Sequence, residues 1–229
     1  RKESIVSPPS RCPACGHRLS PAELVPVVSW IALRGRCRHC GARISPRYPI
    51  TELLTAALFA AVALRFGIAW VTLPMLFLTA VLIAASLIDA EHAIIPNGLV
   101  LAGLVPGVLA AALRMNGGPW WDGLAGALAG AVPLIAIDLL SRLILRREGM
   151  GGGDVKLMAM VGLYLGWRLT LLSLLLAVYL GGLAGIVLLA TRVLRRGGQF
   201  PFGPFLADGS MLSMLAGGEI LNWWLGIFA

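Results

Sequence analysis

The feature that most restricts the fold of this chain is the clustering of its apolar residues into runs of about 20. A helix of about 20 apolar residues crosses the ~30 Å hydrocarbon core of a bilayer. Hydrophobic residues make up 58% of the 229 positions and charged residues 13%, whereas a water-soluble domain carries about 25% charged residues. Strands of a membrane barrel would alternate apolar and polar residues instead. We therefore expect an all-α, polytopic transmembrane helix bundle, which excludes a water-soluble or disordered protein.

Charges, prolines, glycines and tryptophans delimit the apolar runs and predict seven membrane spans. We place these spans at about 50–66, 69–88, 98–115, 121–145, 154–167, 169–191 and 203–227. With the N-terminal region in the cytoplasm, every Lys and Arg except Arg65, Arg114 and Arg168 falls on the cytoplasmic side, as the positive-inside rule requires. The span at 154–167 is short enough to be tilted or partly re-entrant.

The first 48 residues differ in composition from the rest, because they are basic, contain all four cysteines and lack an apolar run of membrane length. We predict two domains, a cytoplasmic domain over 1–48 and a transmembrane domain over 49–229. Basic residues of this kind set the orientation in the membrane and meet anionic headgroups. No nucleic-acid-binding motif accompanies them, so lipid is an expected partner and nucleic acid is not.

The four cysteines form two C-x2-C pairs, Cys12 with Cys15 and Cys37 with Cys40. Two such pairs can supply four thiolates to one tetrahedral Zn²⁺ ion. Stable disulfides are disfavoured in the cytoplasm, and a redox C-x2-C would not need a duplicate. We predict a structural zinc site made of these four cysteines. His17 and His39 are chemically able to replace a thiolate, but with four cysteines present they are expected to be bystanders. A domain this small has little core, so the metal is expected to supply folding free energy.

Two aspartates stand at the ends of predicted spans. Asp89 closes the run LFLTAVLIAASLID, and Asp154 follows Gly151–Gly153 and opens the run VKLMAMVGLYLGW. In the seven-span topology, both lie at the cytoplasmic ends of their helices. A carboxyl pair there suits aspartyl-protease chemistry, in which an ionised group takes a proton from water while its protonated partner polarises the scissile carbonyl. The spacing leaves a second interpretation equally open, in which both are polar helix-end residues that face headgroups or pair with Lys156 and Arg147.

Other acids and glycines in the spans have less specific interpretations. Asp138 is either a further functional acid or a polar residue buried near Ser141. Asp208 is a candidate lining residue of the active site, and Glu219 has no evident partner. Glu52 is expected either to connect the zinc domain to the bundle or to stabilise a helix N-terminus by its charge. A set of glycines is expected to let helices approach closely, and it comprises Gly123, Gly126, Gly130, Gly181, Gly182 and Gly185.

Five segments of the chain, taken in order, resemble the type IV prepilin peptidases of bacteria. They are CPACGHRLS, VPVVSWIALRGRCRHCGARISPRYPITELL, LIDAEHAIIPN, GMGGGDVKLMA and PFGPFLA, and GGGDVKL resembles the GxGD signature of membrane aspartyl proteases. The resemblance implies that Asp89 and Asp154 are the catalytic pair. It also implies that prepilins or pseudopilins are cleaved at the cytoplasmic face of the bacterial inner membrane. In many members the new N-terminal amine is then methylated with S-adenosylmethionine, for which the sequence indicates no binding residues.

The sequence departs from the family pattern in two places. Family members usually carry one more transmembrane helix before the zinc domain, so a chain that opens at Arg1 is expected to lack one span. Asn97 stands where the family commonly has Asp, and we expect little effect on catalysis because an amide still forms hydrogen bonds. From the residues alone, two other functions stay open: a transporter with an intramembrane acidic relay and a zinc-binding cap, and a non-catalytic assembly scaffold.

Overall fold

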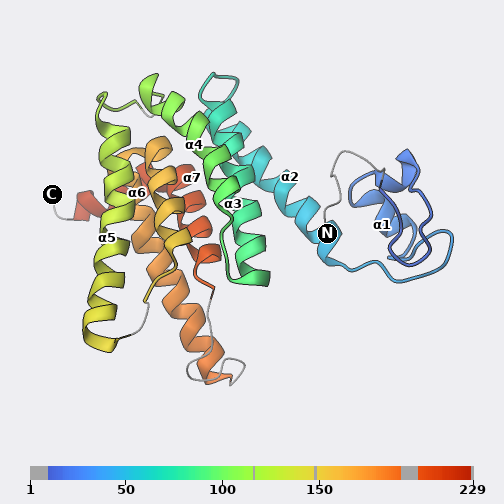
Figure 1. The fold of residues 1–229 in the computed structure, drawn as a ribbon. Helices are drawn as coiled ribbons and strands as arrows, with labels where there is room; N and C mark the ends of the chain where they lie inside the picture. The colour runs from blue at the N-terminus through green and yellow to red at the C-terminus, as the bar shows by residue number, and fades with distance from the viewer. Residues whose placement is uncertain (1–9, 116, 147–148, 192–200, 228–229) are drawn as a thin grey trace. The chain divides into compact units, whose positions relative to one another are not determined.

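The computed structural model describes residues 10–115, 117–146, 149–191 and 201–227. Over these residues the chain forms helices and no strand, which confirms the predicted all-α class. Their extended pairings are two isolated β-bridges, Arg11 with Arg18 and Arg36 with Arg43. Figure 1 shows the helices, which in chain order are η1 (Pro21–Leu24), α1 (Val28–Ala32), α2 (Arg47–Phe66), α3 (Thr72–His92), α4 (Asn97–Ala112), α5 (Asp122–Leu145), α6 (Gly152–Ala190) and α7 (Gly203–Ile227).

Among the described residues, four helices are long and apolar enough to cross a membrane, whereas the hydrophobic runs predicted seven spans. They are α2, α3, α6 and the Asp122–Ile144 part of α5. α4 is apolar but shorter, and α7 occupies the predicted range 203–227. The chain is therefore a membrane protein with a helical bundle.

The predicted spans at 154–167 and 169–191 both lie in α6, which is interrupted at Gly166. This residue has φ +75° and ψ 172°, a conformation essentially restricted to glycine. The chain folds back there, because Met158 before the kink and Ser173 after it approach the neighbouring α7 residues Ser210 and Gly209. In a straight helix, fifteen residues would separate the two positions by about 22 Å. Two helical segments, as the sequence indicated, therefore meet at Gly166.

The core of the bundle is built around α6, which packs against α3, α4, α5 and α7. α5 and α6 approach each other closely at glycines of α5, which have no side chain. A Cβ atom on Gly126 would overlap the carbonyl oxygen of Gly162, and one on Gly130 would overlap that of Met158. The prediction of close approach is thus confirmed for these glycines of α5. It is wrong for Gly182 and Gly185, because no atom of the described residues lies within 4 Å of a Cβ position at either glycine.

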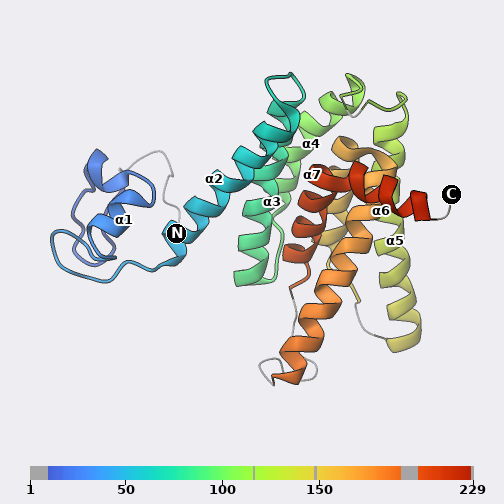
Figure 2. The ribbon, with the colours of Figure 1, turned by 180° about the vertical axis from the view of Figure 1, so that it is seen from behind.

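The chain divides into two compact units, Arg1–Ala60 and Ala61–Ala229. The division falls inside α2, so the predicted domain boundary after residue 48 stays a prediction. Within the first unit, the Glu52 carboxylate in α2 accepts a hydrogen bond of 2.7 Å from the Val27 backbone N–H. Glu52 therefore connects the cysteine-containing region to the first long helix, one of the two roles expected from the sequence. Figure 2 shows the helices of the second unit from behind.

Candidate active site and metal site

Asp89 lies in the last turn of α3, which ends at the left-handed residue Ala93. Its side chain is buried, with 6% of the residue surface exposed. Its Oδ2 atom accepts a 2.8 Å hydrogen bond from the backbone N–H of Gly203, the first residue of α7. Figures 1 and 2 show the end of α3 beside the start of α7. The start of one helix thereby fixes the carboxyl group at the end of another.

Asp154 lies in the first turn of α6, which follows the N-cap residue Gly151. It is also buried, with 8% of its surface exposed. The two carboxyl groups are close enough for the charge on Asp89 to act on Asp154. The fold thus brings together the two aspartates that the sequence singled out, although 65 positions separate them in the chain (154 − 89).

Glycines leave room around both carboxyl groups. A Cβ atom on Gly203 would lie 2.6 Å from Oδ2 of Asp89, and one on Gly151 would lie 3.1 Å from Oδ2 of Asp154. Gly153 packs against Ile95, to whose Cβ an added Cβ would come within 2.9 Å. A Cβ atom at Gly203 would therefore force the Asp89 carboxyl group to move, and one at Gly151 would fit tightly against Asp154.

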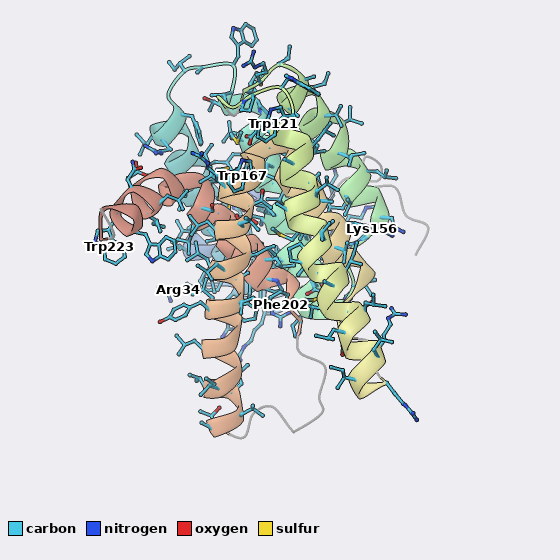
Figure 3. All side chains as sticks on the ribbon, turned by 90° about the vertical axis from the view of Figure 1, so that its left-hand side faces the viewer. Arg34, Trp121, Lys156, Trp167, Phe202 and Trp223 are labelled. Atoms are coloured by element: carbon cyan, nitrogen blue, oxygen red, sulfur yellow. The ribbon has the colours of Figure 1, made fainter. Side chains whose placement is uncertain are left out.

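Lys156, which the sequence offered as a partner for the aspartates, pairs elsewhere. Its Nζ atom donates a 2.9 Å hydrogen bond to Oδ1 of Asn97, the first residue of α4. Figure 3 labels Lys156 in the first part of α6 and Phe202 just before α7. Among the described residues, no ion pair joins Lys156 to either aspartate. The other suggested partner, Arg147, lies outside the described residues.

Asp138 supports the chain that leads into the glycine run. Its Oδ1 atom accepts hydrogen bonds from the backbone N–H groups of Gly149 (3.1 Å) and Met150 (3.3 Å). Its Oδ2 atom lies 2.9 Å from Nε of Arg142. Asp138 is therefore an ion-paired loop anchor that accepts hydrogen bonds from these three donors.

The two remaining acids of α7 are exposed and lie apart in the sequence. Asp208 is exposed, and no hydrogen bond or ion pair of the described residues joins it to the aspartate pair. Glu219 forms a 2.8 Å ion pair with Arg65. The expectation that Glu219 has no partner was therefore wrong, because sequence spacing could not show that α2 and α7 meet at this point.

The four cysteines form one cluster in which all four Sγ atoms lie within 4.8 Å of one another. Cys12 and Cys40, from different C-x2-C pairs, have their Sγ atoms 3.9 Å apart. A tetrahedron of Zn–S bonds of about 2.3 Å places its sulfur atoms about 3.8 Å apart, so the spacing fits such a metal. All four thiols are free rather than joined in disulfides. The cluster can therefore hold a metal ion.

Backbone geometry shapes the two cysteine turns alike. The N–H of Gly16 donates to the carbonyl of Cys12 at 2.8 Å, and that of Gly41 donates to the carbonyl of Cys37 at 2.9 Å. The N–H of Cys15, with further donors, lowers the pKa of the Cys12 thiol to about 7, which favours the thiolate that metals bind. The rings of His17 and His39 stack edge to face, 4.1 Å apart, and neither belongs to the cluster.

Comparison with known proteins places the chain among bacterial peptidases. Residues 1–66 match the bacterial peptidase A24 N-terminal domain, and residues 76–186 match the type IV leader peptidase family. The chain is 41% identical to a prepilin leader peptidase/N-methyltransferase of Pseudomonas aeruginosa, over 97% of this chain and 76% of that protein. The chain belongs to the type IV leader peptidase family.

Two further proteins described as prepilin leader peptidase/N-methyltransferase resemble this chain to a similar degree. That of Aeromonas hydrophila is 40% identical over 98% of this chain and 77% of its own. That of Bacillus subtilis is 37% identical over 97% of this chain and 87% of its own. No solved structure matches the chain significantly.

Sequence reasoning missed two contributors to the site of this type IV leader peptidase family member. The backbone N–H of Gly203 donates a hydrogen bond to Asp89, although the sequence assigned no role to this residue of PFGPFLA. A glycine at a helix start between two prolines is a usable indicator of close approach. Asn97 was noted only as a departure from the family pattern, whereas it is the acceptor for Lys156 and ties α4 to α6.

Proposed function

We propose that this chain is a membrane aspartyl endopeptidase that cleaves the leader peptide of type IV prepilins or pseudopilins. The observation that carries the proposal is the meeting of two buried carboxyl groups, Asp89 and Asp154, from the ends of two membrane helices. The relatives described as prepilin leader peptidase/N-methyltransferase supply the substrate class. Asp138 is ion-paired rather than free for a relay, which does not favour a transporter.

The proposed mechanism uses the two aspartates as general base and general acid. The ionised carboxylate takes a proton from water as the water oxygen attacks the scissile carbonyl carbon, and the protonated partner donates its proton to the carbonyl oxygen. Collapse of the tetrahedral intermediate breaks the C–N bond: the leaving amine takes up the proton from the base, and one hydroxyl of the intermediate returns its proton to the aspartate that acted as the acid. The Gly203 N–H holds the Asp89 carboxyl in place, and the side-chain-free residues Gly151–Gly153 leave space for an extended substrate backbone.

The proposed substrate has a leader at the cytoplasmic face and an apolar helix in the bilayer. Cationic residues support this sidedness, because Arg142 and Arg146 end α5 and Lys156 lies in the first turns of α6, near Asp154. Cytoplasmic ends of spans carry such excess positive charge. We place the aspartates and the cysteine cluster on the cytoplasmic side of the bacterial inner membrane.

Zn²⁺ is the metal proposed for Cys12, Cys15, Cys37 and Cys40, in a structural role. Four thiolates leave no open coordination position, which is typical of structural rather than catalytic zinc. The second proposed activity is methylation of the newly exposed N-terminal amine with S-adenosylmethionine. Support for it comes from the relatives' description, and we assign no residue of this chain to it.

Cleavage of a model prepilin in proteoliposomes tests the proposal. We expect Asp89→Asn and Asp154→Asn each to abolish cleavage, since an amide can neither take up nor release the required proton. Glu219→Gln is the matched control, because it removes a carboxylate that pairs with Arg65 instead. Retained cleavage in either aspartate variant would refute the pair. A product heavier by one methylene group, only when S-adenosylmethionine is present, would support methylation.

A further inference from the structure

The first unit contains a second site, separate from the cysteine cluster, that the proposed reaction does not use. It is an open pocket of about 500 Å³. We call it the arginine pocket, and its lining residues are Trp30, Arg34, Gly35, Arg36, Arg43, Ile44, Ser45 and Pro46. Three arginines and one tryptophan among the lining residues point to a ligand with a compact anionic group.

The wall of the arginine pocket is held together by the protein itself. The indole Nε1–H of Trp30 donates to the carbonyl of Ile44 at 3.2 Å, and the N–H of Ile44 donates to the carbonyl of Gly35 at 2.8 Å. Trp30 lies directly against Gly35, where an added Cβ would come within 2.7 Å of the ring. The pocket is therefore pre-formed rather than dependent on a ligand for its shape.

The positive charge of the arginine pocket is not neutralised by the described residues. Arg36 and Arg43 face each other across a β-bridge, and all three arginines are exposed. Neither of the ion pairs Arg65–Glu219 and Arg142–Asp138 involves an arginine of the pocket. Guanidinium groups bind phosphate with two parallel hydrogen bonds, so a phosphate group matches the charge and the donor type of these three arginines.

The arginine pocket directly precedes a membrane-length helix in the chain. Its last lining residue, Pro46, is followed at once by Arg47, where the membrane-length helix α2 begins. The bond between Val27 and Glu52 ties the same part of the unit to the second turn of that helix. A pocket next to the end of a span lies at the depth of lipid headgroups.

Apolar side chains on the same unit suit that depth. Four large aliphatic residues of η1, α1 and the segment between them are exposed, and they are Leu24, Val25, Val28 and Ile31. Aliphatic side chains beside basic ones are the pattern by which protein surfaces enter the headgroup region of anionic membranes.

We propose that the arginine pocket binds the phosphate group of an anionic glycerophospholipid and thereby holds the cysteine-containing unit at the membrane surface. The occupant is a lipid headgroup rather than a soluble phosphate, because the pocket adjoins a span and exposed aliphatic residues. The proposal does not depend on the peptidase activity, since it concerns residues remote in sequence from both aspartates.

The test is calorimetric titration of the full, zinc-loaded chain in detergent with short-chain phosphatidylglycerol. The pocket variant carries Arg34→Gln, Arg36→Gln and Arg43→Gln. Its matched control carries Arg11→Gln, Arg18→Gln and Arg38→Gln, which removes the same charge from the same unit and includes the other β-bridge pair. We expect affinity to fall at least about tenfold in the pocket variant and by less than about twofold in the control. Equal affinities of the two variants would overturn the proposal.

Two further measurements separate the alternatives. Arg34→Lys, Arg36→Lys and Arg43→Lys together keep the charge but remove the planar guanidinium donors, so we expect intermediate affinity. Affinity equal to that of the unmodified chain would show diffuse charge attraction and overturn the pocket. Inorganic phosphate and glycerol 3-phosphate are expected not to displace the lipid at equal concentration. Displacement by them would assign the pocket to a soluble phosphate and refute the lipid. Zinc content, measured for each variant, verifies that the unit is folded.

Discussion

Gly203 is the residue whose replacement tests the geometry of the aspartate pair most directly. In Gly203→Ala the new Cβ would lie 2.6 Å from Oδ2 and 2.9 Å from Cβ of Asp89, so the carboxyl group must move. A displacement of about 1 Å at a catalytic group costs about 100-fold in rate. We therefore expect kcat for prepilin cleavage to fall about 100-fold.

Gly182→Ala is the matched control for Gly203→Ala, since the same added methyl group meets no atom within 4 Å. Its kcat should equal that of the unmodified protein. A Gly203→Ala enzyme that cleaves at full rate would show that the position of Asp89 does not depend on the start of α7.

Asp138 is expected to act on catalysis through the chain that precedes Asp154. Asp138→Ala removes the acceptor for the N–H groups of Gly149 and Met150 and should lower kcat about tenfold with little change in KM. Arg142→Gln removes the partly exposed ion pair but leaves the acceptor for the two N–H groups in place, and such a pair contributes little to stability. Kinetics of the two variants separate these roles, and equal losses in both would contradict the loop-anchor role of Asp138.

Single residues also show where prediction from sequence stops. The sequence singled out Asp89 and Asp154 for two reasons. Carboxyl groups within or beside membrane spans are costly, and both residues lie in segments that resemble those of a known family. The partners of Lys156 and Glu219 were not found, because a hydrogen bond to Asn97 and an ion pair to Arg65 depend on how separate helices pack. The residue pattern of one helix does not indicate which side chains of a neighbouring helix will contact it.

At the scale of elements, α6 depends on its break at Gly166. Any L-residue at φ +75° and ψ 172° is strained by about 1–3 kcal/mol, so Gly166→Ala should lower the free energy of unfolding by about that amount. Thermal unfolding in detergent measures the change. Gly185→Ala is the control in the same element, as it adds a methyl group in open space. If Gly166→Ala unfolded at the same temperature as the unmodified protein, the backbone conformation at Gly166 would not require glycine.

Hydropathy predicted the helical elements well because a membrane imposes both length and apolar composition on each span. Two separate runs correctly indicated a break in α6, since charge and aromatic residues at Trp167 and Arg168 interrupt the apolar sequence. Close helix contacts were predicted only in part. Gly126 and Gly130 face a neighbouring backbone, whereas Gly182 and Gly185 do not, and the spacing of glycines alone could not separate the two cases.

At the scale of the whole molecule, composition separated a basic, cysteine-containing region from an apolar bundle, and the structure also has two compact units. The exact division could not be read from sequence because α2 continues through it, from Arg47 to Phe66. Two units joined by one helix are expected to lose their structure separately. The metal-binding cluster provides the means to test this.

Removal of the metal should unfold the first unit and leave the second intact. In the first unit, the cysteine-containing region from 10 to 46 buries only Cys12, Gly35 and Cys37 among the described residues, so the metal must replace the missing core. The second unit holds most of the buried apolar side chains. After chelation, we expect proteolysis within 10–46 to become at least about tenfold faster while cuts in the bundle stay unchanged.

Limited proteolysis followed by mass spectrometry measures both rates in one sample, and restored zinc should reverse the effect. Cys15→Ser, which removes one ligand of the cluster, should reproduce the effect of chelation without any chelator. His39→Gln is its control, because His39 lies beside the cluster without belonging to it. Continued protection of 10–46 in the metal-free chain would mean that contacts other than the metal hold this unit, whereas faster cleavage in the bundle would mean that the two units unfold together.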